Sequence, residues 1–202
     1  VSASTEEEWL EQVSVAARSD DERIGVLTAH PVWIVRAFRR ALAAEGRADE
    51  LKALLAADNS APEVTLTALP GLASIPAESA STPHSPIGFY AGGGDPLPFI
   101  TDSEGRVRVQ DEGSQLAALA LSRAEPVRAG ERWLDLCAGP GGKAAVLAAE
   151  ALLGGAVLEA NEVSHTRARL VRGSLIGIPG GVEVSEEDGR SRAGAAQYDR
   201  IL

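Results

Sequence analysis

Three glycines near the middle of the chain stand between an apolar stretch and a run of strong helix formers. The apolar stretch covers residues 133–137, the glycines lie within residues 139–142, and the helix formers cover residues 144–153. Glycine lets a backbone approach a ligand closely, and the first N–H groups of a helix are free to bind an anionic group. The pattern therefore predicts a buried strand, a ligand-binding turn and a helix, in that order.

Three kinds of nucleotide site compete for this turn. A phosphate loop would need a glycine and a hydroxyl where the chain has Cys137 and Ala144. The dinucleotide fingerprint fits better, because residues 139–144 satisfy G-x-G-x-x-A and Glu162 follows roughly 20 residues later. S-adenosylmethionine fits as well, since its ribose needs a carboxylate after the second strand and its methionine carboxylate suits a helix N-terminus. Spacing alone leaves both NAD and S-adenosylmethionine open.

Acidic residues around the turn could hold the ribose of either cofactor. Glu162 is favoured over Glu159, because Glu162 follows its predicted strand and can turn into the crevice where such sheets bind ligands. Asp188 precedes a glycine and is expected at the same crevice. Asp135 lies within a strand and is expected to brace the glycine turn through backbone N–H groups. Lys143 is expected to help hold the carboxylate of the cofactor.

Cys137 is the only cysteine of the chain. We interpret it as a small core residue at the end of a buried strand, and not as a nucleophile. A single cysteine can form neither an internal disulfide nor a Cys-x-x-Cys metal site, which fits a reducing compartment. The three scattered histidines give no metal-ligand spacing.

The sequence around the turn resembles the first cofactor motif of the Sun-type (RsmB-like) ribosomal RNA cytosine-5 methyltransferases. This motif reads Asp-Leu-Cys-Ala-Gly-Pro-Gly-Gly-Lys at residues 135–143. Four further segments are similar to the family in the same order, at residues 30–35, 109–115, 160–162 and 188–190.

The resemblance implies S-adenosylmethionine as the cofactor and RNA, specifically ribosomal RNA and not DNA, as the partner. The residues it assigns to the cofactor are Cys137, Ala138, Gly139, Pro140, Gly141, Gly142, Lys143, Glu162 and Asp188.

In the family, a thiolate adds to C6 of cytosine to activate C5, and a second thiol assists product release. The Asp-Ala-Pro-Cys and Thr-Cys motifs that carry these thiols would follow Leu202 and are not in this sequence. No catalytic residue is therefore assigned, and the chain alone is expected to be inactive. An NAD-dependent oxidoreductase and a non-catalytic RNA-binding module remain alternatives.

Composition limits the class of protein. Of the 202 residues, 45% are hydrophobic, which is enough for a globular core. The sequence has neither an apolar run of about 18 residues nor a signal peptide, so we expect a cytoplasmic protein without a membrane span. It contains no methionine, which suggests an internal piece of a longer protein.

The net charge of -10 means that any RNA contact must be local. The candidate basic patches are Arg36, Arg39 and Arg40; Arg106 and Arg108; and Arg167, Arg169 and Arg172.

Periodicity predicts an α/β fold, namely a partial, doubly wound parallel sheet of the Rossmann-like methyltransferase type, preceded by a smaller helical and α+β subdomain. Residues 1–29 are expected to form a helical tail or linker, residues 30–105 the N-terminal α+β subdomain, and residues 106–202 the first half of the methyltransferase domain. Strands are expected at residues 64–67, 106–110, 133–137, 156–160, 182–185 and 199–202, with a loop over residues 77–98 around at most one short strand at residues 87–90. The turns after residues 137, 160 and 187 should meet at one crevice.

Overall fold

The computed structural model describes residues 5–192 and 197–202 of the chain. The chain divides into two compact units, Val1–Pro62 and Glu63–Leu202. The division falls after Pro62, whereas the sequence analysis placed domain boundaries after residues 29 and 105. The helices before Pro62 share a small core of their own, and for this reason they separate from the strands that follow.

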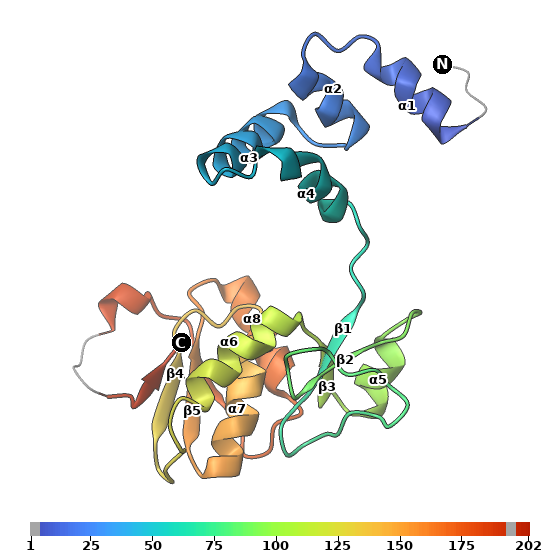
Figure 1. Cartoon of the computed structure of the whole chain (residues 1–202). Helices are drawn as coiled ribbons and strands as arrows, with labels where there is room; N and C mark the ends of the chain where they lie inside the picture. The colour runs from blue at the N-terminus through green and yellow to red at the C-terminus, as the bar shows by residue number, and fades with distance from the viewer. Residues whose placement is uncertain (1–4, 193–196) are drawn as a thin grey trace. The chain divides into compact units, whose positions relative to one another are not determined.

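The first unit is helical (Figure 1). It consists of α1 (Glu6–Ser14), α2 (Asp20–Leu27), α3 (Val32–Ala44), the 3-10 turn η1 (Ala48–Glu50) and α4 (Leu51–Asp58). Thr5 and Ser19 cap α1 and α2, each accepting a hydrogen bond from the backbone N–H three residues later. The core contains Ile24, Val35, Leu51 and Leu55.

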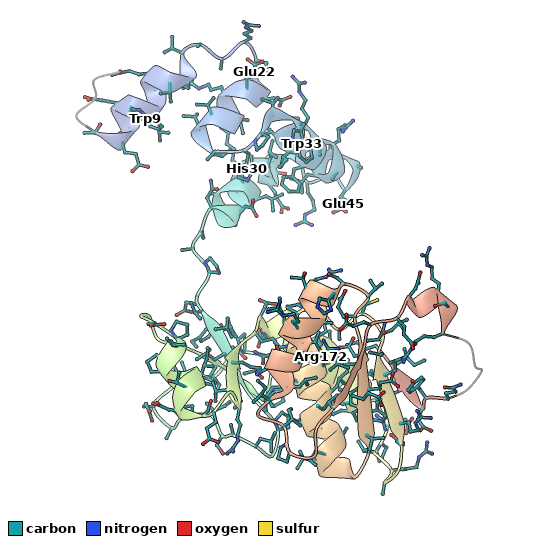
Figure 2. The ribbon with its side chains drawn as sticks, turned by 180° about the vertical axis from the view of Figure 1, so that it is seen from behind. Trp9, Glu22, His30, Trp33, Glu45 and Arg172 are labelled. Atoms are coloured by element: carbon teal, nitrogen blue, oxygen red, sulfur yellow. The ribbon has the colours of Figure 1, made fainter. Side chains whose placement is uncertain are left out.

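His30 connects the start of α3 to the end of α4. Its Nε2 lies 2.8 Å from Asp58 Oδ2, and its Nδ1 lies 2.6 Å from the Thr28 carbonyl oxygen. Trp33, one turn further along the chain, is 70% exposed (Figure 2). The His-Pro-x-Trp segment therefore combines a buried histidine that joins two helices with a tryptophan on the surface of this unit.

The second unit begins with a small antiparallel sheet. Its strands are β1 (Thr65–Ala68), β2 (Gly88–Tyr90) and β3 (Val107–Val109), in the order β2-β1-β3. A short helix, α5 (Leu97–Asp102), precedes β3 within a region where the sequence predicted loop up to residue 98. Its Phe99 packs edge-on against the buried Phe89 of β2, with ring centroids 5.6 Å apart. This contact places apolar residues of α5 on the sheet, which local glycine and proline content does not reveal.

The rest of the second unit is a parallel sheet with helices. The elements are α6 (Glu112–Ser122), β4 (Arg132–Asp135), α7 (Gly142–Gly154), β5 (Val157–Asn161), α8 (His165–Leu175), β6 (Glu183–Ser185), the turn η2 (Gly189–Ser191) and β7 (Arg200–Ile201). The strand order is β6-β5-β4-β7, and all three pairings are parallel. The predicted alternation of strand and helix and the Rossmann-like parallel sheet are confirmed.

α7 is the centre of the core. It contacts α6, α8, β4 and β5 (Figure 1). Its residues Ala144 to Ala151 are all buried. Side chains alternate between the two faces of a strand, so Trp133 and Leu158, which are register partners, face this core. Their neighbours Leu134 and Glu159 face the other side of the sheet, where Glu159 accepts hydrogen bonds from Arg192 and Tyr198.

Within the described residues, no helix is both long and apolar enough to cross a membrane. The same residues contain no group of three or more His, Cys, Asp or Glu side chains arranged to hold a metal ion.

Candidate cofactor site

The glycine turn lies where β4 ends and α7 begins. The Ala138 N–H donates to the Asn161 carbonyl at 2.8 Å, and the Gly141 N–H donates to the Ala138 carbonyl at 2.6 Å. Gly141 has φ of +105°, and a Cβ there would lie 2.7 Å from the Cβ of Ser174. Position 141 therefore requires glycine for both its conformation and its packing against α8.

Glu162 follows β5 and turns toward this glycine turn, as predicted. Its side chain is 4% exposed; Oε2 accepts a hydrogen bond from the Gly139 N–H at 3.2 Å, and Oε1 accepts one from the Ser164 N–H at 2.9 Å. Arg167 Nη2 lies 3.1 Å from Oε1. A Cβ on Gly139 would collide with the Glu162 carboxylate, so this close approach requires glycine.

Asp188 lies after β6 at the start of η2. It accepts a hydrogen bond from the Arg190 N–H at 3.0 Å and pairs with the Arg190 guanidinium. These contacts hold the pKa of Asp188 below its usual value. Its side chain is about two-fifths exposed, so the carboxylate remains accessible.

Two adjoining cavities contain nearly all the predicted site residues. One has a volume of about 430 Å³, and its walls include Cys137, Ala138, Gly139, Pro140, Gly142 and Lys143. The other has a volume of about 380 Å³, and its walls include Cys137, Gly139, Glu162 and Asp188. Cys137 and Gly139 line both, so the cavities meet at the glycine turn. Of the predicted residues, only Gly141 lines neither of the two.

Cys137 is exposed, so the expectation that it is a core residue is wrong. β4 ends at Asp135, two residues before Cys137, and the chain has already turned away from the sheet interior. The thiol therefore belongs to the loop that faces the cavities.

Asp135 is 3% exposed and accepts a hydrogen bond from the Cys137 N–H, which supports its predicted role as a brace of the turn. Burial raises the pKa of Asp135 to about 6, and the nearby Glu162 carboxylate acts in the same direction. The Cys137 hydrogen bond and the Lys143 charge oppose this rise in pKa. Its Oδ2 has no partner among the described residues.

Asn161 is a structural residue that the sequence analysis did not identify. Its Nδ2 donates to the carbonyls of Leu136 and Glu187, both at 3.0 Å, while its Oδ1 accepts from the Glu187 N–H at 3.0 Å. One buried amide thus ties together the three turns that surround the crevice. The signal in the sequence that could have identified Asn161 is an amide side chain at the last position of β5, directly before Glu162.

Most of the candidate RNA-binding arginines pair with acidic residues. Arg36 and Arg39 pair with Asp21, Arg106 with Glu104, Arg167 with Glu162, and Arg172 with Glu186. Burial lowers the pKa of Arg108. In the part of the chain that the structure describes, Arg40 and Arg169 are the members of these patches without an ion pair or hydrogen bond from the guanidinium.

Comparison with known proteins identifies relatives of this site. The family model for the 16S rRNA methyltransferase RsmB/F matches residues 123–202. A putative methyltransferase of Mycobacterium tuberculosis, Rv1407, is 38% identical over 208 residues, an alignment that covers 100% of this chain and 45% of that protein. Ribosomal RNA small subunit methyltransferase B of Pseudomonas putida is 34% identical over 162 residues, covering 73% of this chain and 35% of that protein.

The solved structure of PH0851 matches with a TM-score of 0.70 at 20% identity, covering 86% of this chain and 40% of that one. This match supports the fold. The chain spans less than half the length of these relatives. With the glycine turn and its acidic neighbours in place, the matches in sequence show that the chain belongs to the RsmB/F family of methyltransferases.

Proposed function

We propose that the chain carries the cofactor site of an S-adenosylmethionine-dependent methyltransferase that modifies C5 of cytosine in ribosomal RNA. In this proposal residues 106–202 are the first half of the methyltransferase domain. The names of the Pseudomonas relatives support ribosomal RNA as the substrate. We further propose that the protein is cytoplasmic.

The observation that carries the proposal is the buried Glu162 carboxylate beside the Gly139 N–H. A carboxylate at this place can accept hydrogen bonds from the two ribose hydroxyls. The second cavity would take the adenosine between Glu162 and Asp188, and the first would take the methionine end beside Lys143 and the N-terminus of α7. Because the cavities share Cys137 and Gly139, one elongated ligand can occupy both.

The cofactor supplies an electrophilic methyl group, while C5 of cytosine needs activation before it can accept that group. By family resemblance, a thiolate on C6 provides the activation. Cys137 is the only thiol of the chain and lines both cofactor cavities, so the proposal gives it a cofactor contact and no covalent step. In the whole protein, Cys137→Ser should therefore leave methyl transfer to ribosomal RNA within about threefold. Loss of transfer with cofactor binding intact would contradict this assignment.

Ligand titration tests the choice of cofactor. Calorimetry should detect saturable binding of S-adenosylhomocysteine to this chain and none of NADH. Binding of NADH without any response to S-adenosylhomocysteine would refute the methyltransferase proposal and favour an oxidoreductase.

A further inference from the structure

Arg108 is a half-buried arginine without an anionic partner. Of the arginines in residues 5–192 and 197–202, those that are buried or half-buried are Arg39, Arg106, Arg108, Arg192 and Arg200. The other four each form an ion pair with a carboxylate. Arg108 forms none within the described residues, and its Nε donates to the Gly105 carbonyl at 3.2 Å. The other N–H groups of its guanidinium therefore remain available to an acceptor from outside the unit.

Burial makes the missing partner of Arg108 costly. Desolvation lowers the pKa of Arg108, and no carboxylate opposes this effect. The guanidinium is also held in place, because Gly105 has φ of +79° and a Cβ there would lie 3.7 Å from Arg108 Nη2. The planar N–H fork of an arginine matches the oxygens of a phosphate or a carboxylate. A fixed and partly desolvated guanidinium thus indicates a binding site for such an anion.

The strand face that carries Arg108 leads to the cofactor cavity. Side chains alternate along a strand, so Arg106, Arg108 and Gln110 share one face of β3 and its continuation. A Cβ on Gly177, which follows α8, would lie 3.7 Å from Arg106 Cγ. At the other end, Gln110 lines the cavity of about 430 Å³. Two residues along a strand span about 6–7 Å, so Arg108 lies between the end of α8 and the wall of the cofactor cavity.

We propose that Arg108 binds a phosphate of the RNA backbone and so positions the RNA beside the cofactor cavity. The inference rests on the proposed function, because RNA carries a phosphate at each nucleotide and the base that receives the methyl group must reach this cavity. The net charge of -10 gives the chain little general attraction for RNA. A single desolvated guanidinium near the cavity then decides where the backbone lies. Arg108 is a positioning residue and takes no part in methyl transfer itself.

RNA binding and its salt dependence test the role of Arg108. Fluorescence anisotropy of a labelled oligocytidylate measures the dissociation constant at increasing KCl concentration. Arg108→Gln keeps a polar side chain and removes the charge. It should weaken RNA binding about tenfold and make the slope of log affinity against log salt shallower by about 0.7, as for one phosphate of a single strand. Arg108→Lys keeps the charge and should keep the slope of the unchanged chain.

Arg132→Gln is the matched control, because it makes the same change in net charge. Arg132 begins β4, at the end of the sheet away from the glycine turn. Its guanidinium lies 5.1 Å from the centroid of the Tyr198 ring and forms no ion pair with a described residue. Charges far from a bound phosphate are screened by salt, so this variant should leave RNA affinity within about twofold. Equal weakening in Arg132→Gln and Arg108→Gln would show a general charge effect and overturn the proposal.

Titration with S-adenosylhomocysteine, which carries no phosphate, separates this site from the proposed function. Arg108 lines neither cofactor cavity, so Arg108→Gln should bind this ligand as the unchanged chain does. A parallel loss of S-adenosylhomocysteine binding would show a structural role for Arg108 and overturn the proposal.

The remaining outcomes are also distinct. If the unchanged chain binds S-adenosylhomocysteine, and Arg108→Gln binds RNA as tightly as the unchanged chain, only the phosphate site fails. If the unchanged chain binds S-adenosylhomocysteine but no RNA, the phosphate site and the RNA substrate fail while the cofactor site stands. If it binds neither, the proposed function fails as well. Displacement of RNA by NADH, whose phosphates could use the same guanidinium, would overturn the proposal in favour of a nucleotide cofactor.

Discussion

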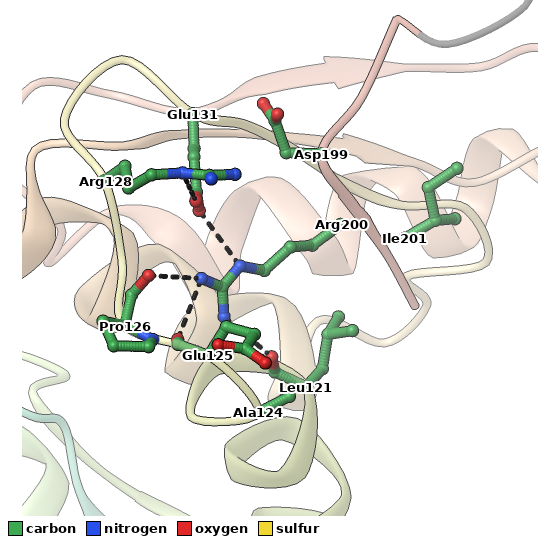
Figure 3. Close-up of a pocket in the computed structure, with 9 residues that line it drawn as sticks. All are labelled: Leu121, Ala124, Glu125, Pro126, Arg128, Glu131, Asp199, Arg200 and Ile201. Atoms are coloured by element: carbon green, nitrogen blue, oxygen red, sulfur yellow. Dashed lines mark hydrogen bonds and ion pairs between the residues drawn. The ribbon is translucent and has the colours of Figure 1, made fainter.

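Arg200 Nε donates a hydrogen bond to Glu131 Oε2 at 3.0 Å, with both side chains more than nine-tenths buried (Figure 3). The guanidinium also donates to the carbonyls of Leu121, Ser122, Glu125 and Pro126, at 2.7–3.2 Å. It stacks over the Trp133 ring, 4.8 Å from its centroid. One side chain of β7 thus satisfies the last carbonyls of α6 and closes the end of the sheet away from the glycine turn.

Removing this guanidinium should destabilise the second unit strongly. Arg200→Met removes the buried cationic partner of Glu131 and leaves several carbonyls without this donor, and we expect a loss of about 3–5 kcal/mol in the free energy of unfolding, measured with urea. Arg128→Met is the matched control. Arg128 contacts the other oxygen of Glu131 at 3.1 Å but is 78% exposed, so its loss should cost about 1 kcal/mol or less. Equal losses in the two variants would contradict this account.

Stability should depend on pH through Glu131. The Trp133 indole N–H and then the Arg200 guanidinium lower the pKa of Glu131 to about 2, against the opposing effect of burial. A carboxyl whose pKa is lower in the folded state stabilises the fold above its unfolded pKa of about 4.5, and this contribution is lost as the pH falls toward 2. The difference in unfolding free energy between the unchanged chain and Glu131→Gln should therefore shrink over that range. A difference that stays constant from pH 5 to pH 2 would show that the pKa is not lowered.

Glu162 and Glu159 should differ in their effect on cofactor binding. Glu162→Gln removes the charge beside the glycine turn and should weaken S-adenosylhomocysteine about tenfold. Glu159 faces the opposite side of the sheet, where Arg192 and Tyr198 contact its carboxylate, so Glu159→Gln should change the dissociation constant by less than about twofold. Calorimetry on both variants measures the two dissociation constants. A larger loss of affinity in Glu159→Gln than in Glu162→Gln would show that the ribose lies on the side of the sheet that Glu159 faces.

Substitution by alanine should change stability in opposite directions at two glycines near α8. Gly141 packs against this helix, and Gly173 lies within it. Gly141 has φ of +105°, and an added Cβ would lie 3.0 Å from the Val171 Cα, so Gly141→Ala should destabilise by about 1–3 kcal/mol. Gly173 lies within α8 with no atom within 4 Å of an added Cβ. Gly173→Ala should stabilise by up to about 1 kcal/mol, because alanine favours the helix. Urea unfolding of the two variants measures both effects; stabilisation by Gly141→Ala would mean that the turn adopts a different conformation.

Features that depend on neighbouring residues could be predicted from the sequence. A short apolar strand, glycines and a helix-forming run predicted β4, the turn and α7, because positive φ at Gly141 and the propensities around it are local properties. The position of Glu162 after its strand also predicted correctly that it turns toward the glycines.

Which distant residues share the site could not be predicted in this way, because it depends on long-range packing. Gln110 reaches the cavity because the Gln115 amide and the β1 backbone hold it against Gly142. Asn161 ties three turns together, and Cys137 faces the cavities because β4 ends before it. Each of these outcomes depends on how the chain packs over long sequence separations, where the burial of apolar side chains and the pairing of polar groups outweigh local preference.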